Sequence, residues 1–133
     1  MRVVFDTNVF IAAFVSDGIC ARLVRRARRR ELELFICKIV LLEFSSKLKV
    51  KFHCTTKEIE RACILISEAA SAVLTEGVLQ TPVCRDRDDD LILACAETAG
   101  AEYLVTGDND LLVLERYGRC NILSPRDFEL LFE

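Results

Sequence analysis

Residues 2–8 read Arg2-Val3-Val4-Phe5-Asp6-Thr7-Asn8. The apolar part of this stretch is short and rich in β-branched residues, which indicates a buried strand. Thr7 and Asn8 are both residue types that cap helices, and the apolar segment Val9–Val15 follows as the expected first helix. A buried strand that passes directly into a helix, with an acid at the junction, indicates the first unit of an α/β fold.

The rest of the chain continues this alternation. Expected strands cover Glu31–Cys37, Val78–Val83, Tyr103–Val105 and a segment around Cys120–Leu123. Expected helices cover Ile19–Arg30, Ile39–Val50, a long segment capped by Thr55 or Thr56, Asp88–Ala99 closed by Gly100, Asp110–Glu115, and a terminal helix that starts at Pro125. Strands that alternate with helices predict a parallel sheet with helices on both faces. We expect one domain over residues 1–133, since this length is typical of a single domain.

Composition and the N-terminus bound the class of protein. The chain is 52% hydrophobic, which provides ample material for a core. It begins without an apolar signal-peptide region and holds no apolar run of 18 residues, so we expect a cytoplasmic protein without a membrane segment. The seven cysteines have no C-x-x-C pair, and we expect free, buried thiols in a reducing compartment. The single histidine, His53, is not expected to build a zinc site with such scattered thiols.

Acids follow two of the expected strands. Asp6 ends the first strand, and Asp108 follows the strand at Tyr103–Val105. In parallel α/β sheets the functional site lies beyond the carboxyl ends of the strands, so these two acids are expected to meet there with Asp110. Each of the three could instead simply cap the helix that follows it.

Glu43 lies within an apolar helical segment. Glutamate is rarely buried unless it has a partner, and an unpaired buried carboxylate is costly. One interpretation is a surface ion pair with Lys47, four residues later. The other is a carboxylate that points at a cation.

The densest charge run is Arg85-Asp86-Arg87-Asp88-Asp89-Asp90. Asp86 and Asp88 fit a solvated helix start, where acids interact favourably with the helix dipole. A calcium-binding EF-hand loop is rejected because Leu91 stands where that loop needs glycine. Asp90 opens an amphipathic helix and is expected to face the strand ends. Although the net charge is −3, the chain outside this expected acidic site carries a net positive charge.

Four separated motifs together resemble the PIN domain. They are Asp6-Thr7-Asn8, Glu43 in its apolar helix, Asp90-x-x-Leu93-Ala94, and Thr106-Gly107-Asp108-x-Asp110. Residues 88–90 with 100–108 are similar to the branch of VapC-like toxins of toxin–antitoxin pairs. The resemblance implies a three-layer α/β/α sandwich with a mainly parallel sheet. It also implies an antitoxin partner and a homodimer.

The resemblance further implies a ribonuclease that depends on Mg²⁺ or Mn²⁺, ions that carboxylate oxygens bind well. Its acidic quartet would be Asp6, Glu43, Asp90 and Asp108, with help from Asp110 and support from Asn8 and Thr106. Asp89 competes with Asp90 as the ligand, and Asp90 is preferred for its spacing to Leu93 and Ala94. No histidine is placed to act as a catalytic acid or base.

An arginine-rich helix provides candidate RNA contacts, namely Arg22, Arg25, Arg26 and Arg29. A solvated helix face and an antitoxin-binding surface are the alternatives. Two further functions stay open, a metal-dependent DNA nuclease and a catalytically silent PIN-fold binding module. A receiver-type phospho-acceptor domain is disfavoured, because the first strand ends in one acid and no lysine follows Lys57.

Overall fold

The computed structural model describes residues 1–75 and 83–133, and these residues form a sheet of six strands in the order β3-β2-β1-β4-β6-β5. The strands are β1 Arg2–Phe5, β2 Glu33–Cys37, β3 Ala72–Leu74, β4 Tyr103–Val105, β5 Arg116–Tyr117 and β6 Cys120–Leu123. The helices are α1 Thr7–Val15, α2 Ile19–Arg28, α3 Lys38–Val50, α4 Thr56–Ala69, α5 Arg87–Ala99, α6 Asn109–Leu112 and α7 Pro125–Glu129, which a short 3₁₀ turn, Leu130–Phe132, follows.

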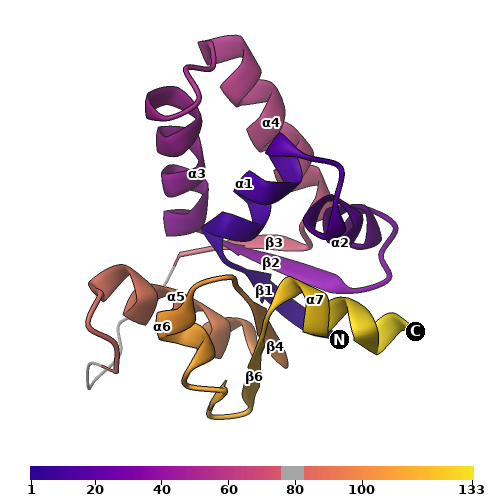
Figure 1. Ribbon diagram of the computed structural model, residues 1–133, viewed down its shortest axis with the longest axis vertical. Helices are drawn as coiled ribbons and strands as arrows, with labels where there is room; N and C mark the ends of the chain where they lie inside the picture. Colours follow the sequence, from indigo (N-terminus) through magenta and orange to yellow (C-terminus); the bar gives the residue numbers. More distant parts are fainter. Residues whose placement is uncertain (76–82) are drawn as a thin grey trace.

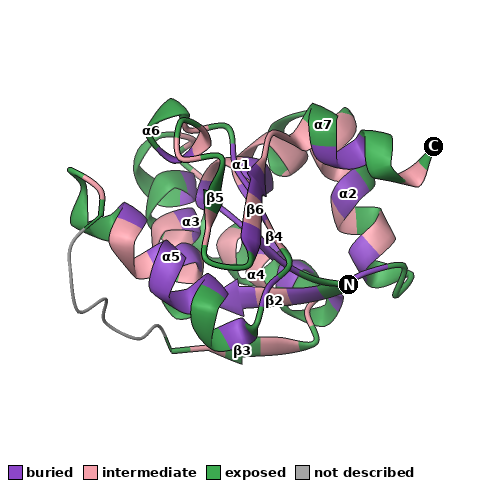
Figure 2. Cartoon of the chain, turned by 90° about the horizontal axis from the view of Figure 1, so that it is seen from below, coloured by how far each residue is buried: buried purple, intermediate pink, exposed green. Residues whose placement is uncertain are grey.

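The sheet is parallel except at one edge, where β5 runs antiparallel to β6. Helices α1 to α4 lie on one face of it, and α5 lies on the other (Figure 1). Seen from below, α5 covers the sheet with a largely buried inner side (Figure 2). The mainly parallel α/β/α sandwich predicted from the sequence is therefore confirmed.

The order of the strands reverses at one place in the sheet, which is its topological switch point. From central β1 the chain steps outward to β2 and then β3, and it returns to β4 on the opposite side of β1. Helices that leave two neighbouring strands toward opposite faces separate beyond the strand ends, and ligands of open α/β sheets bind there. In this chain that point lies beyond Phe5 and Val105, which are paired in register.

Aromatic side chains fill the layer between the sheet and its upper helices. Phe5, Phe10 and Phe44 are buried, with ring centroids 5.7 Å apart for the first pair and 6.2 Å apart for the second. Buried aromatic rings contribute large apolar areas and prefer such tilted contacts. They hold α1 and α3 against β1, and both helices begin at the carboxyl edge of the sheet.

The helix starts differ in detail from the sequence prediction. The first helix begins at Thr7 and is capped by Asp6, not by Thr7 or Asn8, because Asp6 Oδ1 accepts the Thr7 backbone N–H over 2.7 Å. Of the two threonines proposed to cap the long helix, Thr55 does so, in a reciprocal capping box with Glu58. The closure of α5 by Gly100 in a left-handed conformation is confirmed.

Two short strands were not predicted. β3 pairs with β2 at Ala72–Leu74, whereas the strand expected at Val78–Val83 falls almost wholly outside the described residues. Val83, which is described, lies in no strand. β5 contains two residues, too few for an alternating pattern to be visible.

The expectation that all cysteines are free is wrong for one pair. Cys37 and Cys95 form a disulfide between the end of β2 and α5, with their Cα atoms 6.0 Å apart. These residues are 58 positions apart in the sequence, so only the packing of α5 on the sheet brings them together. Cys20, Cys54, Cys63, Cys84 and Cys120 are free. Within the described residues no single helix is long and apolar enough to cross a membrane.

Candidate functional site

Asp6 is the centre of a buried hydrogen-bond network at the carboxyl end of β1. Only 5% of this residue is exposed. Its Oδ2 accepts the Thr106 hydroxyl over 2.7 Å and the Asn8 amide over 3.0 Å, while Oδ1 accepts the Thr7 backbone N–H. The network fixes the orientation of a carboxylate that burial alone would disfavour.

The same network ties the loop after β4 to the start of α1. Asn8 Oδ1 accepts the backbone N–H of Gly107 over 2.8 Å, and Thr106 Oγ1 accepts the backbone N–H of Asp108 over 3.0 Å. Both side chains thus connect residues 98 or more positions apart in the sequence. Asn8 and Thr106 thus both donate to Asp6, and their predicted role in support of a metal ligand stays a prediction.

Three acids, one each from α5, the β4–α6 loop and the first turn of α6, form a cluster among the described residues. Carboxylate oxygens of Asp89, Asp108 and Asp110 all lie within 4.8 Å of one another. Asp108 also caps the short helix α6, because its Oδ1 accepts the Asp110 backbone N–H over 2.9 Å. Asp108 therefore caps a helix, as one interpretation of the sequence allowed, and also lies in the acidic cluster.

The structure places Asp89, and not the preferred Asp90, in this cluster. Asp90 Oδ1 accepts two backbone N–H groups of the preceding loop, from Val83 over 3.1 Å and from Cys84 over 2.8 Å. Successive residues of a helix point about 100° apart, so this contact turns Asp89 toward the strand ends. Asp89 is 6% exposed. The preference for Asp90 rested on its spacing to Leu93 and Ala94, which carries no information about its hydrogen bonds to the loop.

Glu43 approaches the network from α3. Its Oε2 accepts the Thr7 hydroxyl over 3.2 Å, whereas its Oε1 is buried and has no hydrogen-bond partner. In the described part of the chain Glu43 makes no ion pair with Lys47, which is exposed. A buried carboxylate oxygen without a hydrogen-bond donor is unfavourable, so this arrangement calls for an explanation.

Burial and mutual repulsion raise the pKa values of the inner acids. Burial raises the pKa of Asp89 to about 7, and the negative charges of Asp108 and Asp86 add to the rise. Burial is also the largest cause of the raised pKa of Asp6 and of Glu43. The charge of Asp108 adds to the rise for Asp6, and the charges of Asp88 and Asp6 add to the rise for Glu43. Several acids with raised pKa values at one place are typical of functional sites.

Two site residues were missed at the level of sequence. Thr7 was considered only as a helix cap, yet it links Asp6 and Glu43 by donating from its N–H to one and from its hydroxyl to the other. Arg85 Nη2 lies 2.9 Å and 3.2 Å from the two carboxylate oxygens of Asp110, although the arginine side chain is 87% exposed. Neither contact has a local sequence signal, because both depend on how the loops meet.

The remaining acids of the charged run have structural roles. Asp86 is exposed and caps α5, with its Oδ1 accepting the Asp88 backbone N–H over 2.9 Å. Asp88 is exposed in the first helical turn. The solvated helix start proposed for these two residues is confirmed. His53 lies exposed in the turn between α3 and α4.

The candidate RNA-binding arginines are engaged to different degrees. Arg26 Nε lies 2.6 Å from the buried carboxylate of Glu129, and its guanidinium lies over the Phe132 ring at 4.4 Å. Arg22 also approaches Glu129, at 3.7 Å, and Arg25 pairs with Asp17 at 2.8 Å. Arg29 ends α2 and is exposed. Arg26 thus joins α2 to the C-terminal segment, while the other three have their charged groups at the surface.

Fold and site together define the class of protein: a parallel α/β sandwich with clustered carboxylates at the switch point of its sheet. Residues 2–110 match the PIN domain, and the chain belongs to the PIN domain family. The family resemblance read from the sequence is therefore confirmed.

One protein is similar to this chain in sequence and one solved structure is similar to it in fold. It is 28% identical to an uncharacterized protein of Methanocaldococcus jannaschii, in an alignment that spans 100% of this chain and 92% of the relative. Its fold is similar to a chain of VapBC2 from Rickettsia felis, solved bound to a DNA fragment from its promoter. The TM-score is 0.67 and the match covers 93% of this chain and 98% of that chain, at 15% identity, which shows a shared fold.

Proposed function

We propose that this protein is a nuclease that hydrolyses RNA phosphodiester bonds with the help of Mg²⁺ or Mn²⁺. The observation that carries the proposal is the convergence of Asp89, Asp108 and Asp110 within 4.8 Å, beside the buried Asp6 and the half-buried Glu43. PIN domains are typically nucleases, which supports the same conclusion.

The residues present fit a divalent ion. Carboxylate oxygens are the hard ligands that Mg²⁺ and Mn²⁺ prefer. Asp89 and Asp108 offer oxygens on one side, Asp6 and the unpartnered Glu43 Oε1 offer them from β1 and α3, and Asp110 assists. We infer the ligand set Asp6, Glu43, Asp89 and Asp108, in which Asp89 takes the place first given to Asp90. When bound, the ion supplies Lewis-acid chemistry, because it neutralises the phosphate and favours ionisation of the attacking water.

The protein's own groups hold the acids ready for this task. Thr106 and Asn8 keep Asp6 oriented by donating to the same oxygen, and Thr7 holds one oxygen of Glu43 so that the other stays open. Such partners of ligating groups set ligand orientation and usually matter for affinity. The exposed Arg85, beside Asp110, is suited to contact a substrate phosphate at the rim.

Two alternative functions have clear tests. A DNA nuclease would use the same metal chemistry, and a silent binding module would keep the fold without turnover. The deciding experiment incubates purified protein with matched single-stranded RNA and DNA of the same sequence, with Mn²⁺, with Mg²⁺ and with excess EDTA. We expect cleavage of RNA only, lost in EDTA and restored by either ion. Equal cleavage of DNA would favour the first alternative, and undiminished cleavage in EDTA would exclude the metal mechanism.

A second observation favours a protein partner. A groove of about 630 Å³ lies among α1, α2, α3 and α4. Phe14 and Leu65 in it are large apolar side chains exposed to solvent, and its rim carries four cations, Arg25, Arg28, Lys57 and Arg61, against one acid, Glu58. Such a surface suits an amphipathic segment with an acidic edge. We propose that an antitoxin-like partner binds this groove.

The test of the partner uses the product of the reading frame adjacent to this gene, co-expressed with a tagged form of this chain. Leu65→Asp should abolish co-purification, and Arg61→Glu should weaken it in a salt-dependent way. Ile64→Asp is the matched control, because Ile64 is exposed on the same helix but lies outside the groove. Equal co-purification of all three variants would exclude the groove. A homodimer stays a prediction, to be measured by light scattering.

A further inference from the structure

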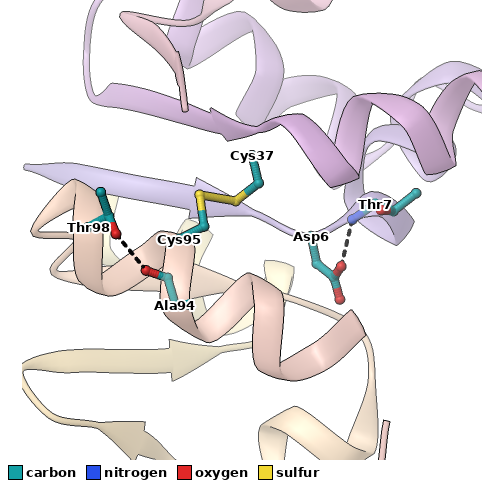
Figure 3. The surroundings of a disulfide bond; sticks show 6 residues. All are labelled: Asp6, Thr7, Cys37, Ala94, Cys95 and Thr98. Carbon is teal, nitrogen blue, oxygen red and sulfur yellow. Dashed lines mark hydrogen bonds between the residues drawn. A yellow bond between two sulfur atoms is a disulfide. The ribbon is translucent and has the colours of Figure 1, made fainter. Parts of the chain in front are cut away.

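The Cys37–Cys95 disulfide crosses between two layers of the sandwich close to the acidic site. Cys37 is the last residue of β2 and the N-cap of α3, whereas Cys95 lies in α5 on the other face of the sheet. Figure 3 shows the bond beside the end of β1, with Asp6 pointing away from it on the same edge of the sheet. The bond is therefore a covalent link between α5, which carries Asp89, and the residue that precedes α3, which carries Glu43.

The bridge stands at equal sequence distances from the two acids. Glu43 follows Cys37 by six residues, and Asp89 precedes Cys95 by six residues. With a rise of 1.5 Å per residue, each acid lies about 9 Å along its helix from the bridge. Over so short a rigid segment, movement of α5 against α3 is transmitted directly to the gap between the carboxylates.

Near the disulfide, few large apolar side chains of α5 pack against the rest of the protein. Ala94, Ala96 and Ala99 contribute small buried side chains, and Ile92 and Leu93 supply the bulk of its apolar contact. The acids at its first turn repel those of the β4–α6 loop in the absence of a cation. The covalent link between α5 and the β2–α3 junction limits how far α5, and Asp89 with it, can move in response to this repulsion.

We propose that the Cys37–Cys95 disulfide is a positioning device that fixes the Glu43–Asp89 gap and thereby strengthens binding of a divalent ion. This inference rests on the proposed metal site. The bond forms when the two thiols give up two electrons and two protons to a small disulfide oxidant, which leaves as two thiols. Both cysteines are fully buried, so a reductant reaches the bond only when α5 opens.

The first measurement establishes the bond. Wild-type protein is unfolded and alkylated with and without prior reduction, and the alkyl groups are counted by mass spectrometry. The chain has seven cysteines, of which five are free in the structure, so we expect five alkyl groups without reductant and seven with it. Seven in both samples would overturn the proposal.

The second measurement asks whether the bond positions ligands or only adds stability. Mn²⁺ affinity is measured by calorimetry, well below the melting temperature, for oxidised wild type, for wild type refolded in a phosphine reductant, and for Cys37→Ala/Cys95→Ala. We expect the last two to bind Mn²⁺ about tenfold more weakly, the low end of losses seen when groups that orient ligands are removed.

Two controls separate the outcomes. Leu23→Ala removes a buried side chain of α2 and should lower the melting temperature without changing Mn²⁺ affinity, while Cys63→Ala should change neither appreciably. Equal Mn²⁺ affinity in the oxidised and the bridge-free protein, with only the melting temperature lowered, would overturn the positioning role. Absence of Mn²⁺ binding in every form would overturn the metal site itself and this inference with it.

Discussion

The hydroxyl of Thr106 lies 2.7 Å from Oδ2 of Asp6, and it donates to this carboxylate across 100 positions of sequence. The two residues end neighbouring strands, β4 and β1, at the switch point of the sheet. Thr106 is fully buried and also accepts the backbone N–H of Asp108. One hydroxyl thus sets the orientation of two acids of the candidate site.

Removal of this hydroxyl should weaken metal binding. Thr106→Val keeps the shape of the side chain but leaves the Asp6 oxygen and the Asp108 N–H without their shared partner. We expect about tenfold weaker Mn²⁺ binding by calorimetry and destabilisation by about 1–3 kcal/mol. Thr106→Ser keeps the hydroxyl and should restore most of the affinity. If the Val and Ser variants bind Mn²⁺ equally, Thr106 has no orienting role.

Replacement of Asp89 by Asn and replacement of Asp90 by Asn should have different effects on the rate of RNA cleavage. Asp89→Asn removes a proposed ligand and should lower RNA cleavage by orders of magnitude, measured as initial rate with Mn²⁺. Asp90→Asn weakens the contacts to the Val83 and Cys84 N–H groups and should cost about 1 kcal/mol of stability with a much smaller loss of rate.

Asp17 provides the control for that pair. Asp17 forms an ion pair with Arg25, is mostly exposed and is not part of the acidic cluster. Asp17→Asn should therefore keep the wild-type rate of RNA cleavage. A larger loss for Asp90→Asn than for Asp89→Asn would return the ligand assignment to Asp90.

The order of strands and helices could be predicted because hydrophobic periodicity is a local property. Tyr103–Val105 and Cys120–Leu123 have the predicted bounds, and Gly100 closes its helix as expected. The position of Asp6 and Asp108 also followed, since parallel strands place their carboxyl ends at one edge.

The parts that could not be predicted depend on contacts between distant segments. The choice of Asp89 is decided by the hydrogen bonds of Asp90 to a loop, and a run of three aspartates looks the same in either case. The Cys37–Cys95 bond has no sequence signal because its spacing is unlike that of a metal or redox motif. Arg26 was grouped with the other arginines, since the partner that buries it, Glu129, lies at the far end of the chain.

The surface arginines should contribute to RNA affinity through phosphate contacts. Arg25→Glu with Arg29→Glu reverses two exposed charges of α2. We expect weaker RNA binding and a log–log salt slope that is lower by about one for each lost contact. Titrations by fluorescence anisotropy at several salt concentrations measure both quantities.

A variant of Arg26 is the control that distinguishes an effect on RNA binding from an effect on stability. Arg26→Gln leaves the buried carboxylate of Glu129 with only the more distant Arg22, at 3.7 Å, as a charged partner. The variant should be destabilised by about 2–4 kcal/mol, while the salt slope of the folded protein stays unchanged. An unchanged slope in the Arg25/Arg29 variant would assign α2 to a solvated face or to the groove partner.

The stability of the metal-free protein should fall as pH rises from about 4 to 7. Burial and neighbouring charge raise the pKa of Asp89 to about 7, against about 4 in the unfolded chain. Between these values the folded state holds more protons than the unfolded state, so the free energy of unfolding decreases with rising pH and levels off above the folded pKa. Asp6 and Glu43, whose pKa values burial also raises, act in the same direction. Thermal melts in EDTA should therefore show a decreasing melting temperature across this window.

A divalent ion and the substitution Asp89→Asn should each restore the stability that the metal-free protein loses at high pH. At pH 7.5 a divalent ion that binds only the folded arrangement should raise the melting temperature, and more so as its concentration rises above Kd. Asp89→Asn removes the group with the highest raised pKa, so the metal-free variant should melt higher than metal-free wild type at pH 7.5 and show a shallower pH dependence, while gaining less from Mn²⁺. Asp17→Asn should follow wild type in every condition. A variant that melts lower than wild type at both pH 4 and pH 7.5 without metal would mean that Asp89 is a stabilising partner, and that the acids are not held together against their repulsion.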